Sequence, residues 1–467
     1  MADTVVFSDS YVWTFCCQLA ILFGAMLVGN IIRTRVPYIK KLYIPSALLG
    51  GLVVLLMKLI PAVNSFIDNV TMQIVAYHCL GLGFAAMALK TMKNKRSVST
   101  TKIVESGAIM AGSYLIQAIV GLAISIAAFF IADYFFAAGL ILPMGFGQST
   151  GSALSWGSNY ETSYGFTGGA SYGLAVAAIG FIVGSVIGVM YLNIASRRGK
   201  VKLRRVTQQT DETEQVDKNE IPNSESIDKL SIQACFMVLA YILSYGFMRL
   251  LSMTGISAIS DLAWGLNFMW ALLFGFIIKL ILNKLNKKGI VRRHYVNNNL
   301  MDRMSGFMFD MMIVSGVIAI DFEAVYMNLP LLIVTCAAGT VVTFVYVKIA
   351  TRNTYKGYEL ESFLTNFGTV TGTVSTGMIL LREIDPNYST PAASNIVLQN
   401  IPSLVLLAPL LLTLGFAASS LTNTLIMFGV YVLLFIAYNI FLFRRRIFKK
   451  HYLGKPEEVW DEPKKQE

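Results

Sequence analysis

Apolar residues along this chain form long continuous runs, which short polar or basic segments separate. A bilayer core of about 30 Å needs about 20 apolar residues in one helix, so runs of this length predict membrane-spanning helices. Eleven such runs are found, at residues 11–32, 43–60, 72–89, 103–132, 168–193, 231–252, 262–284, 304–322, 329–350, 392–415 and 421–443. The pattern therefore predicts an all-α integral membrane protein.

Two stretches, 134–167 and 357–391, fit neither a spanning helix nor a simple loop. Each contains a segment rich in Gly, Ser and Thr between long apolar runs. Backbone groups at membrane depth must be paired internally unless they are buried in protein or line a wet cavity. We therefore predict a re-entrant hairpin in each stretch.

The two predicted hairpins share a motif. Phe146–Ser152 and Phe367–Thr373 both read F-G-x-x-T-G followed by Ser or Thr. Matching helix-breaking segments in the two halves of a chain are typical of secondary transporters whose binding site lies near the bilayer midplane. The repeated motif therefore indicates transport.

Composition and charge narrow the choice of class. A chain of 467 residues that is 55% hydrophobic and 14% charged is no ordinary soluble protein. The net charge of +11 does not indicate a nucleic-acid partner, because the Lys and Arg residues are concentrated in particular segments. All but four of the 38 lie in 33–41, 90–102, 196–230, 284–303, 348–356 and the tail after residue 443.

The segments that connect the predicted spans on the opposite side, such as 61–71, 253–261 and 323–328, contain no Lys or Arg. Basic residues mark the cytoplasmic side of a membrane protein. The distribution therefore predicts a multi-pass protein with an outer N-terminus, a cytoplasmic linker at 196–230 and a cytoplasmic C-terminus. Two exceptions, Lys58 and Arg249, lie near outer helix ends, where their long side chains are expected to reach the lipid headgroups.

With this topology, the first five spans and their hairpin follow the same course as the next five, upside down. We predict two inverted five-helix repeats, residues 1–195 and 231–420, each with one re-entrant hairpin. The linker 196–230 joins them, and an eleventh helix with a cytoplasmic tail, 421–467, follows.

The hairpin tips are the candidate binding site. Glycines let the backbone approach a ligand closely, half-helix N-termini attract anions, and freed carbonyl and hydroxyl oxygens suit Na⁺. The predicted substrate-binding residues are Gly147, Gln148, Ser149, Thr150, Gly151, Ser152, Gly368, Thr369, Thr371, Gly372, Thr373 and Ser375. The alternative is that these small residues only let helices pack closely.

Polar side chains inside apolar runs give a candidate ion site. The carboxylate of Asp310 would cost about 2.5–3.5 kcal/mol at the bilayer centre, so we expect it to face a cavity or a partner. Asp310 could bind Na⁺ or H⁺, or it could form a structural hydrogen bond. The candidate sodium region comprises Asp310, Asn366, Asn395, Gln399 and Asn400. The amides of 392–415 could equally serve packing.

Two other classes stay open. Gly147–Gly151 matches G-x-S-x-G, the nucleophile elbow of serine hydrolases, and Ser149 could use His78 as its base. The second motif copy has Val370 where that serine stands, which favours a symmetric binding function. The alternative functions are therefore an intramembrane serine hydrolase and a channel.

Four passages resemble the bacterial glutamate–sodium symporter family. They are Lys40–Pro45 with Gly50–Leu52, Gly147–Ala153 with Trp156, Tyr164–Thr167, and Phe367–Thr373. The resemblance holds in register from about residue 40 to 415. It implies Na⁺-coupled uptake of glutamate or a related small anionic amino acid, an elevator-type mechanism, a homodimer and a place in the bacterial inner membrane.

The chain also departs from that family. Gln148 stands where the family has His, Asp310 has no counterpart, and the helix 421–443 is additional. These departures concern the substrate more than the fold. H⁺ stays open as the coupling ion, and no organic cofactor is expected.

Overall fold

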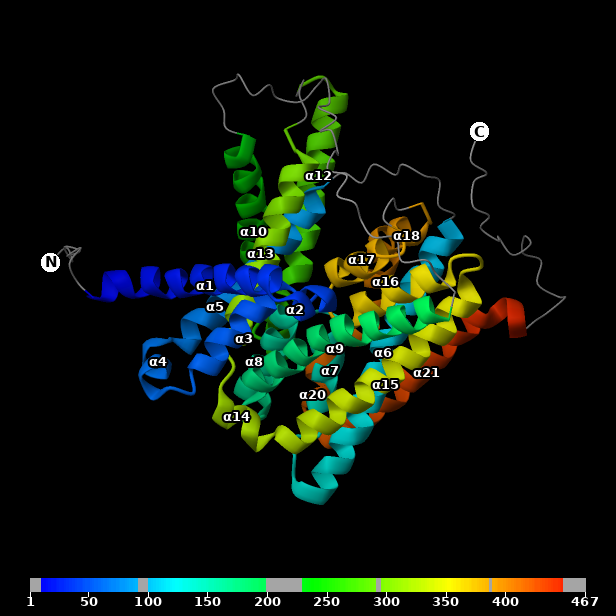
Figure 1. Ribbon diagram of the computed structural model, residues 1–467, viewed down its shortest axis with the longest axis horizontal. Helices are drawn as coiled ribbons and strands as arrows, with labels where there is room; N and C mark the ends of the chain where they lie inside the picture. Colours follow the sequence, from blue (N-terminus) through cyan, green and yellow to red (C-terminus); the bar gives the residue numbers. More distant parts are fainter. Residues whose placement is uncertain (1–9, 91–99, 199–228, 291–294, 386–388, 448–467) are drawn as a thin grey trace.

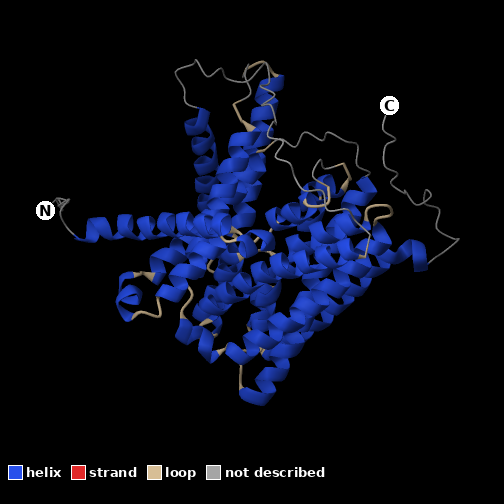
Figure 2. Ribbon diagram, viewed as in Figure 1, coloured by secondary structure: helices blue, strands red, loops and turns tan. Residues whose placement is uncertain are grey.

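The computed structural model describes residues 10–90, 100–198, 229–290, 295–385 and 389–447. Within these residues every element is a helix, as Figure 2 shows, which confirms the predicted all-α class. Most of the predicted linker 196–230 and of the predicted C-terminal tail lies outside the described residues.

The helices follow one another along the chain with short connections. The first half contains α1 (Ser10–Arg35), α2 (Pro37–Leu42), α3 (Ser46–Met57), α4 (Pro61–Phe66), α5 (Asn69–Leu89), α6 (Thr100–Ala132), the 3-10 turn η1 (Ala138–Leu140), α7 (Ile141–Phe146), α8 (Thr150–Tyr164) and α9 (Gly169–Arg197). The second half contains α10 (Lys229–Ser252), α11 (Ser257–Gly265), α12 (Asn267–Lys287), α13 (Asn298–Ile318), α14 (Phe322–Met327), α15 (Leu329–Thr354), α16 (Glu359–Thr371), α17 (Val374–Arg382), α18 (Ala392–Leu398), α19 (Asn400–Leu411), α20 (Leu414–Ala418) and α21 (Leu421–Ile447).

Eight of the described helices are long and apolar enough to cross a membrane, which supports a multi-pass membrane protein. A ninth is reached if the pair Ala392–Leu398 and Pro402–Ala418, bent by 49°, counts as one span. Length and composition alone thus identify eight or nine of the eleven predicted spans. α3 has only 12 residues, about 18 Å of helix, and α13 carries Asp302, Arg303 and Asp310.

Both predicted hairpin stretches contain two short helices that meet at a break. α7 and α8 are separated at residues 147–149, and α16 and α17 are separated at residues 372–373. α9 packs against all four of these helices. It therefore serves as a common support for the two hairpins.

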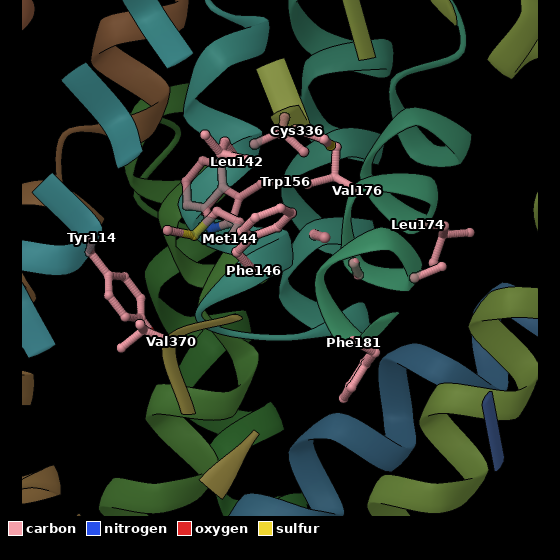
Figure 3. Close-up of a cluster of buried hydrophobic side chains, with 14 of the residues drawn as sticks. Tyr114, Leu142, Met144, Phe146, Trp156, Leu174, Val176, Phe181, Cys336 and Val370 are labelled. Atoms are coloured by element: carbon pink, nitrogen blue, oxygen red, sulfur yellow. The ribbon is translucent and has the colours of Figure 1, made fainter. Parts of the chain in front are cut away.

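The buried apolar side chains form two clusters. The larger cluster includes side chains of the hairpins, α6, α9, α15 and α19, which we call the hairpin body, and it also includes side chains of α1, α3, α5 and α13. Figure 3 shows part of it, where Phe146, Trp156 and Phe181 are fully buried.

The smaller cluster is formed by side chains of α5, α10, α12 and α13. We call α5 and α10–α13 the side bundle; α5 packs against α10, α12 and α13, which stand in the upper part of Figure 1. The two parts meet along α5, which packs against α8.

The place of Lys58 near a helix end predicted that its side chain reaches the lipid headgroups. This prediction is wrong. The Lys58 side chain is buried, and its Nζ donates to the carbonyl oxygens of Ile318 and Ile320, each at 2.9 Å. The last carbonyls of a helix lack partners within the helix and carry partial negative charge. Lys58 therefore satisfies the C-terminal end of α13.

A buried ion cluster fixes α21 to the hairpin body. Glu105 of α6 pairs with Arg444 of α21 at 2.7 Å and with Lys102 at 3.2 Å. Lys102 also donates to the carbonyl oxygen of Thr354 at the end of α15. Three helices therefore meet at one carboxylate.

Candidate functional site

A cavity of about 140 Å³ lies where the hairpin body meets the side bundle. Side chains of α5, α6, α12, α13 and α19 line it together with both hairpin tips. The first tip contributes Gly147, Gln148 and Ser149, and the second contributes Thr369, Gly372, Thr373, Val374 and Ser375. We call this space the tip cavity.

The first tip is held in a strained backbone conformation. Ser149, which precedes α8, has φ 78° and ψ −174°, a region that glycine adopts almost alone. Its side chain makes no capping hydrogen bond to α8. The first amide groups of a helix have no partner within the helix, so the Ser149 side chain leaves the start of α8, directly behind the tip cavity, uncapped.

The second tip is built differently. Thr373 caps α17, where its side chain accepts a hydrogen bond of 3.4 Å from the amide of Thr376. The break also frees carbonyls at the end of α16. One of them, the carbonyl oxygen of Val370, accepts a hydrogen bond of 3.0 Å from Nε2 of Gln117 in α6.

The two hairpins meet on α9 at Gly180. A Cβ added to Gly180 would stand 2.8 Å from the carbonyl oxygen of Thr371 and 2.9 Å from Cδ1 of Phe146. Any larger residue would push one hairpin away. Glycine at this position lets both hairpins reach the same point of the support helix.

The predicted substrate-binding residues divide into two groups. Gly147, Gln148, Ser149, Thr369, Gly372, Thr373 and Ser375 line the tip cavity. Thr150, Gly151, Ser152, Gly368 and Thr371 are buried behind it within the hairpins. The two motif copies differ in this respect because the helix breaks at Ser149 in one copy and at Gly372 in the other.

The predicted ion residues also divide. Asn400 lines the tip cavity, whereas Gln399 lies behind it, where it accepts from Ser106 and contacts Met110. Asp310 is half-buried on α13 and is not among the residues that line the cavity. The described residues contain no group of three His, Cys, Asp or Glu side chains that could hold a metal ion.

Asn366 lies on α16 and Asn395 lies on α18, and these two helices pack against each other beside the second tip. Tyr358, Ser362 and Asn366 recur at four-residue spacing along one face of α16, and the Asn395 amide donates to the Tyr358 hydroxyl at 3.2 Å. The side-chain oxygens of Ser362, Asn366 and Asn395 are buried and have no hydrogen-bond partner. Buried oxygens without partners are costly, and a bound cation would satisfy them.

Sequence reasoning missed Tyr114 of α6. Its ring lies over Gly147, where an added Cβ would come within 2.4 Å of it, and it lines the tip cavity. Its hydroxyl is buried without a partner. Nothing in the sequence distinguishes this tyrosine from others in apolar runs, so no signal could have identified it.

The wall opposite the tips is aromatic. Phe84 of α5 packs on Phe268 and Phe309 of the side bundle, with ring centroids 5.1 and 5.4 Å apart. All three line the tip cavity. The hairpins therefore face an apolar surface.

Ser149 and His78 do not form a catalytic pair in this structure. Ser149 Oγ lies 3.9 Å from the sulfur of Met312, whereas His78 Nδ1 lies 2.9 Å from the Tyr241 hydroxyl. His78 does not line the tip cavity. The geometry thus gives the serine no base.

Comparison with known families gives one match. The family model described as sodium/glutamate symporter matches residues 12–385, which is well over half of the chain. No curated protein matches the chain.

Proposed function

The chain belongs to the sodium/glutamate symporter family, and we propose from this that it is a Na⁺-coupled symporter that binds glutamate in the tip cavity. Membership implies Na⁺-coupled glutamate transport by a membrane protein, and the family is one of transporters and not of enzymes. The observation that carries the placement is that both hairpin tips line one cavity.

Recognition of an anion must come from neutral groups. Asp, Glu, Lys, Arg and His are absent from the described side chains that line the tip cavity. α17 begins at Val374 in the cavity lining, and α8 begins directly after Ser149 of that lining; a helix N-terminus carries about half a positive charge. Two such ends suit the two carboxylates of glutamate, one at each hairpin.

Tyr114 supports this placement of the substrate. Its hydroxyl is buried without a partner at the edge of the cavity, beside the first tip. A buried hydroxyl that bonds nothing favours a polar ligand. Glutamate in the cavity would supply the acceptor that the protein lacks.

We place the Na⁺ at the buried oxygens of Ser362, Asn366 and Asn395. Their partnerless oxygens fit a hard cation; Ser362 and Asn366 lie on α16, which leads to the second tip, and Asn395 lies on α18, which packs against α16. An ion there would fix the tip and compensate the substrate's charge. By linkage, Na⁺ and substrate would each raise the affinity for the other by the same factor.

The position of the cavity supports elevator-type movement. The cavity lies between the hairpin body and the side bundle, and the bundle offers an aromatic wall there. Apolar surfaces slide without breaking directional bonds. We propose that the hairpin body moves along the side bundle, which would act as the scaffold of a homodimer.

The wider organisation completes the proposal. Residues 1–195 and 231–420 would be the inverted repeats, with 196–230 as linker and 421–467 as an appended helix and tail. The protein would lie among the lipids of a bacterial inner membrane, with its N-terminus outside and its C-terminus in the cytoplasm. The distribution of Lys and Arg supports this orientation.

The decisive experiment is uptake of labelled glutamate into proteoliposomes. An inward Na⁺ gradient should drive accumulation, and replacing Na⁺ with choline should abolish it. Full uptake in choline that collapses when a pH gradient is removed would show that H⁺ is the coupling ion. Equilibration without accumulation would indicate a channel.

A further inference from the structure

A second cavity, of about 470 Å³, lies on the same boundary as the tip cavity. It is lined by the first part of α5, the last part of α8, and α11. By the distribution of Lys and Arg, these parts lie toward the outer face, because the segments 61–71 and 253–261 carry no basic residue. We call this cavity the vestibule.

The vestibule and the tip cavity are stacked along the same helices. On α5, Gln73 and Tyr77 line the vestibule, and Phe84 lines the tip cavity about two turns further on. Hairpin one shows the same order, with Asn159 in the vestibule and Ser149 in the tip cavity. The two spaces therefore lie in series.

A thin barrier separates them. A Cβ on Gly151 would stand 2.7 Å from Cβ of Leu80, so α5 and α8 touch between the two cavities. Asn267 of α12 lies at the same level and donates to the Tyr77 carbonyl at 3.1 Å. The Asn267 side-chain oxygen is buried without a partner.

One face of α8 brings a row of polar side chains to the vestibule. Its polar residues recur at helical spacing along that face, at Ser155, Ser158, Asn159, Thr162 and Ser163. The side-chain oxygen of Asn159 is buried without a hydrogen-bond partner. A row of hydroxyl and amide oxygens can replace part of the hydration shell of a hard cation.

One carboxylate, Asp261 of α11, sets the charge of the vestibule. Lys and Arg are absent from its described lining. The Tyr164 hydroxyl donates to Asp261 at 3.1 Å and holds the carboxylate in place. A cleft whose lining carries charge of one sign concentrates ions of the opposite sign and repels ions of the same sign.

We propose that the vestibule is a cation antechamber, which gathers Na⁺ on its way to the hairpin tips before glutamate binds. The proposal rests on the Na⁺-coupled function proposed above. A net negative vestibule attracts Na⁺ and disfavours an amino acid with two carboxylates. The Leu80–Gly151 contact closes the antechamber from the tip cavity.

The test compares Na⁺ titrations of glutamate uptake in proteoliposomes. Asp261→Asn should raise the Na⁺ concentration for half-maximal uptake by about tenfold, and the glutamate KM at saturating Na⁺ should not rise. Glu323→Gln is the matched control, because Glu323 is an exposed carboxylate outside the vestibule. It should leave both values unchanged.

A second variant adds charge and does not depend on the Tyr164 bond. Ser158→Asp should lower the half-saturating Na⁺ concentration. An unchanged Na⁺ dependence in this variant, or a raised glutamate KM with unchanged Na⁺ dependence in Asp261→Asn, would overturn the antechamber. If the rate of wild-type glutamate uptake does not depend on Na⁺, the proposed symport itself is overturned.

Discussion

Ser149 holds a backbone conformation that costs about 1–3 kcal/mol in a residue with a side chain. Ser149→Gly removes both the strain and the hydroxyl, whereas Ser149→Ala removes the hydroxyl alone. We expect only the glycine variant to raise the melting temperature. Both variants should weaken glutamate affinity by about 0.5–1.5 kcal/mol, the contribution of one hydrogen bond, if the hydroxyl binds substrate.

Thermal unfolding and equilibrium glutamate binding measure the two effects separately. Unchanged affinity in both variants would remove Ser149 from the binding site. Covalent labelling of wild-type Ser149 by a fluorophosphonate would favour the hydrolase over the carrier.

Asp385 links the end of hairpin two to the turn before α18. Burial alone would raise its pKa, but hydrogen bonds from Ser389 and Thr390 outweigh burial and hold the pKa below its ordinary value. A lowered folded-state pKa adds stability that is complete at neutral pH and is lost as the pH falls through that value.

Melting temperatures between pH 5 and pH 8 should therefore not depend on the ionisation of Asp385. Asp385→Asn should lower the melting temperature over that whole range, because the neutral amide cannot accept the four bonds as strongly. A difference between variant and wild type that appears only near pH 7 would contradict this account.

Single residues were the least predictable from sequence. The glycines and hydroxyls of the tips were identified because breaks in apolar helices are conspicuous. Tyr114 and the Phe84 wall were not, because an aromatic residue that lines a cavity and one that packs in a core follow the same pattern. Lys58 was misplaced because its partners are carbonyls more than 250 positions away.

At the scale of elements, α21 is held by charge as well as by apolar packing. Glu105 is 4% exposed in its side chain and faces both Arg444 and Lys102. Glu105→Ala would remove the one carboxylate that these two buried cations share, which costs about 3–5 kcal/mol. We expect a clear fall in the melting temperature of the detergent-solubilised protein.

The Lys90–Asp302 pair is the control for this prediction. The Asp302 side chain is 59% exposed, and exposed pairs contribute no more than about 1 kcal/mol. Asp302→Ala should therefore change the melting temperature little. Equal effects of the two substitutions would show that the buried cluster does not fix α21.

Hairpins were predictable as elements, but their breaks were not. The motif aligns Gly147 with Gly368, although Gly147 lies at a tip and Gly368 lies inside α16. Where a helix ends depends on which partners receive the freed groups. Gln117 of α6 provides such a partner for the second hairpin, from a distant part of the sequence.

At the scale of the whole molecule, the orientation in the membrane makes a direct prediction. In a background without native cysteines, Asn64→Cys should react with an impermeant thiol reagent in intact cells. Lys288→Cys should react only after the membrane is opened. Both positions are exposed, so accessibility within the protein does not separate them.

The reverse labelling pattern would invert the topology and place the vestibule on the cytoplasmic side. The tip cavity and its lining would be unaffected. The orientation rests on the distribution of Lys and Arg along the chain. The predicted spans 43–60 and 304–322 do not pass the test of length and composition, because α3 has 12 residues and α13 carries three charged residues.

The neutral lining of the tip cavity has an electrical consequence. When the carrier returns empty, a binding site without formal charge contributes no charge on which the membrane voltage could act. At this site the voltage therefore acts only in the step that carries ion and substrate. One glutamate carries a single net negative charge, and each further elementary charge across 100 mV changes the energy by about 2.3 kcal/mol. Over a full cycle the carrier's own charges return to their starting positions, so the ratio of charge moved to glutamate taken up counts the sodium ions: zero means one ion per substrate, and each added positive charge means one more.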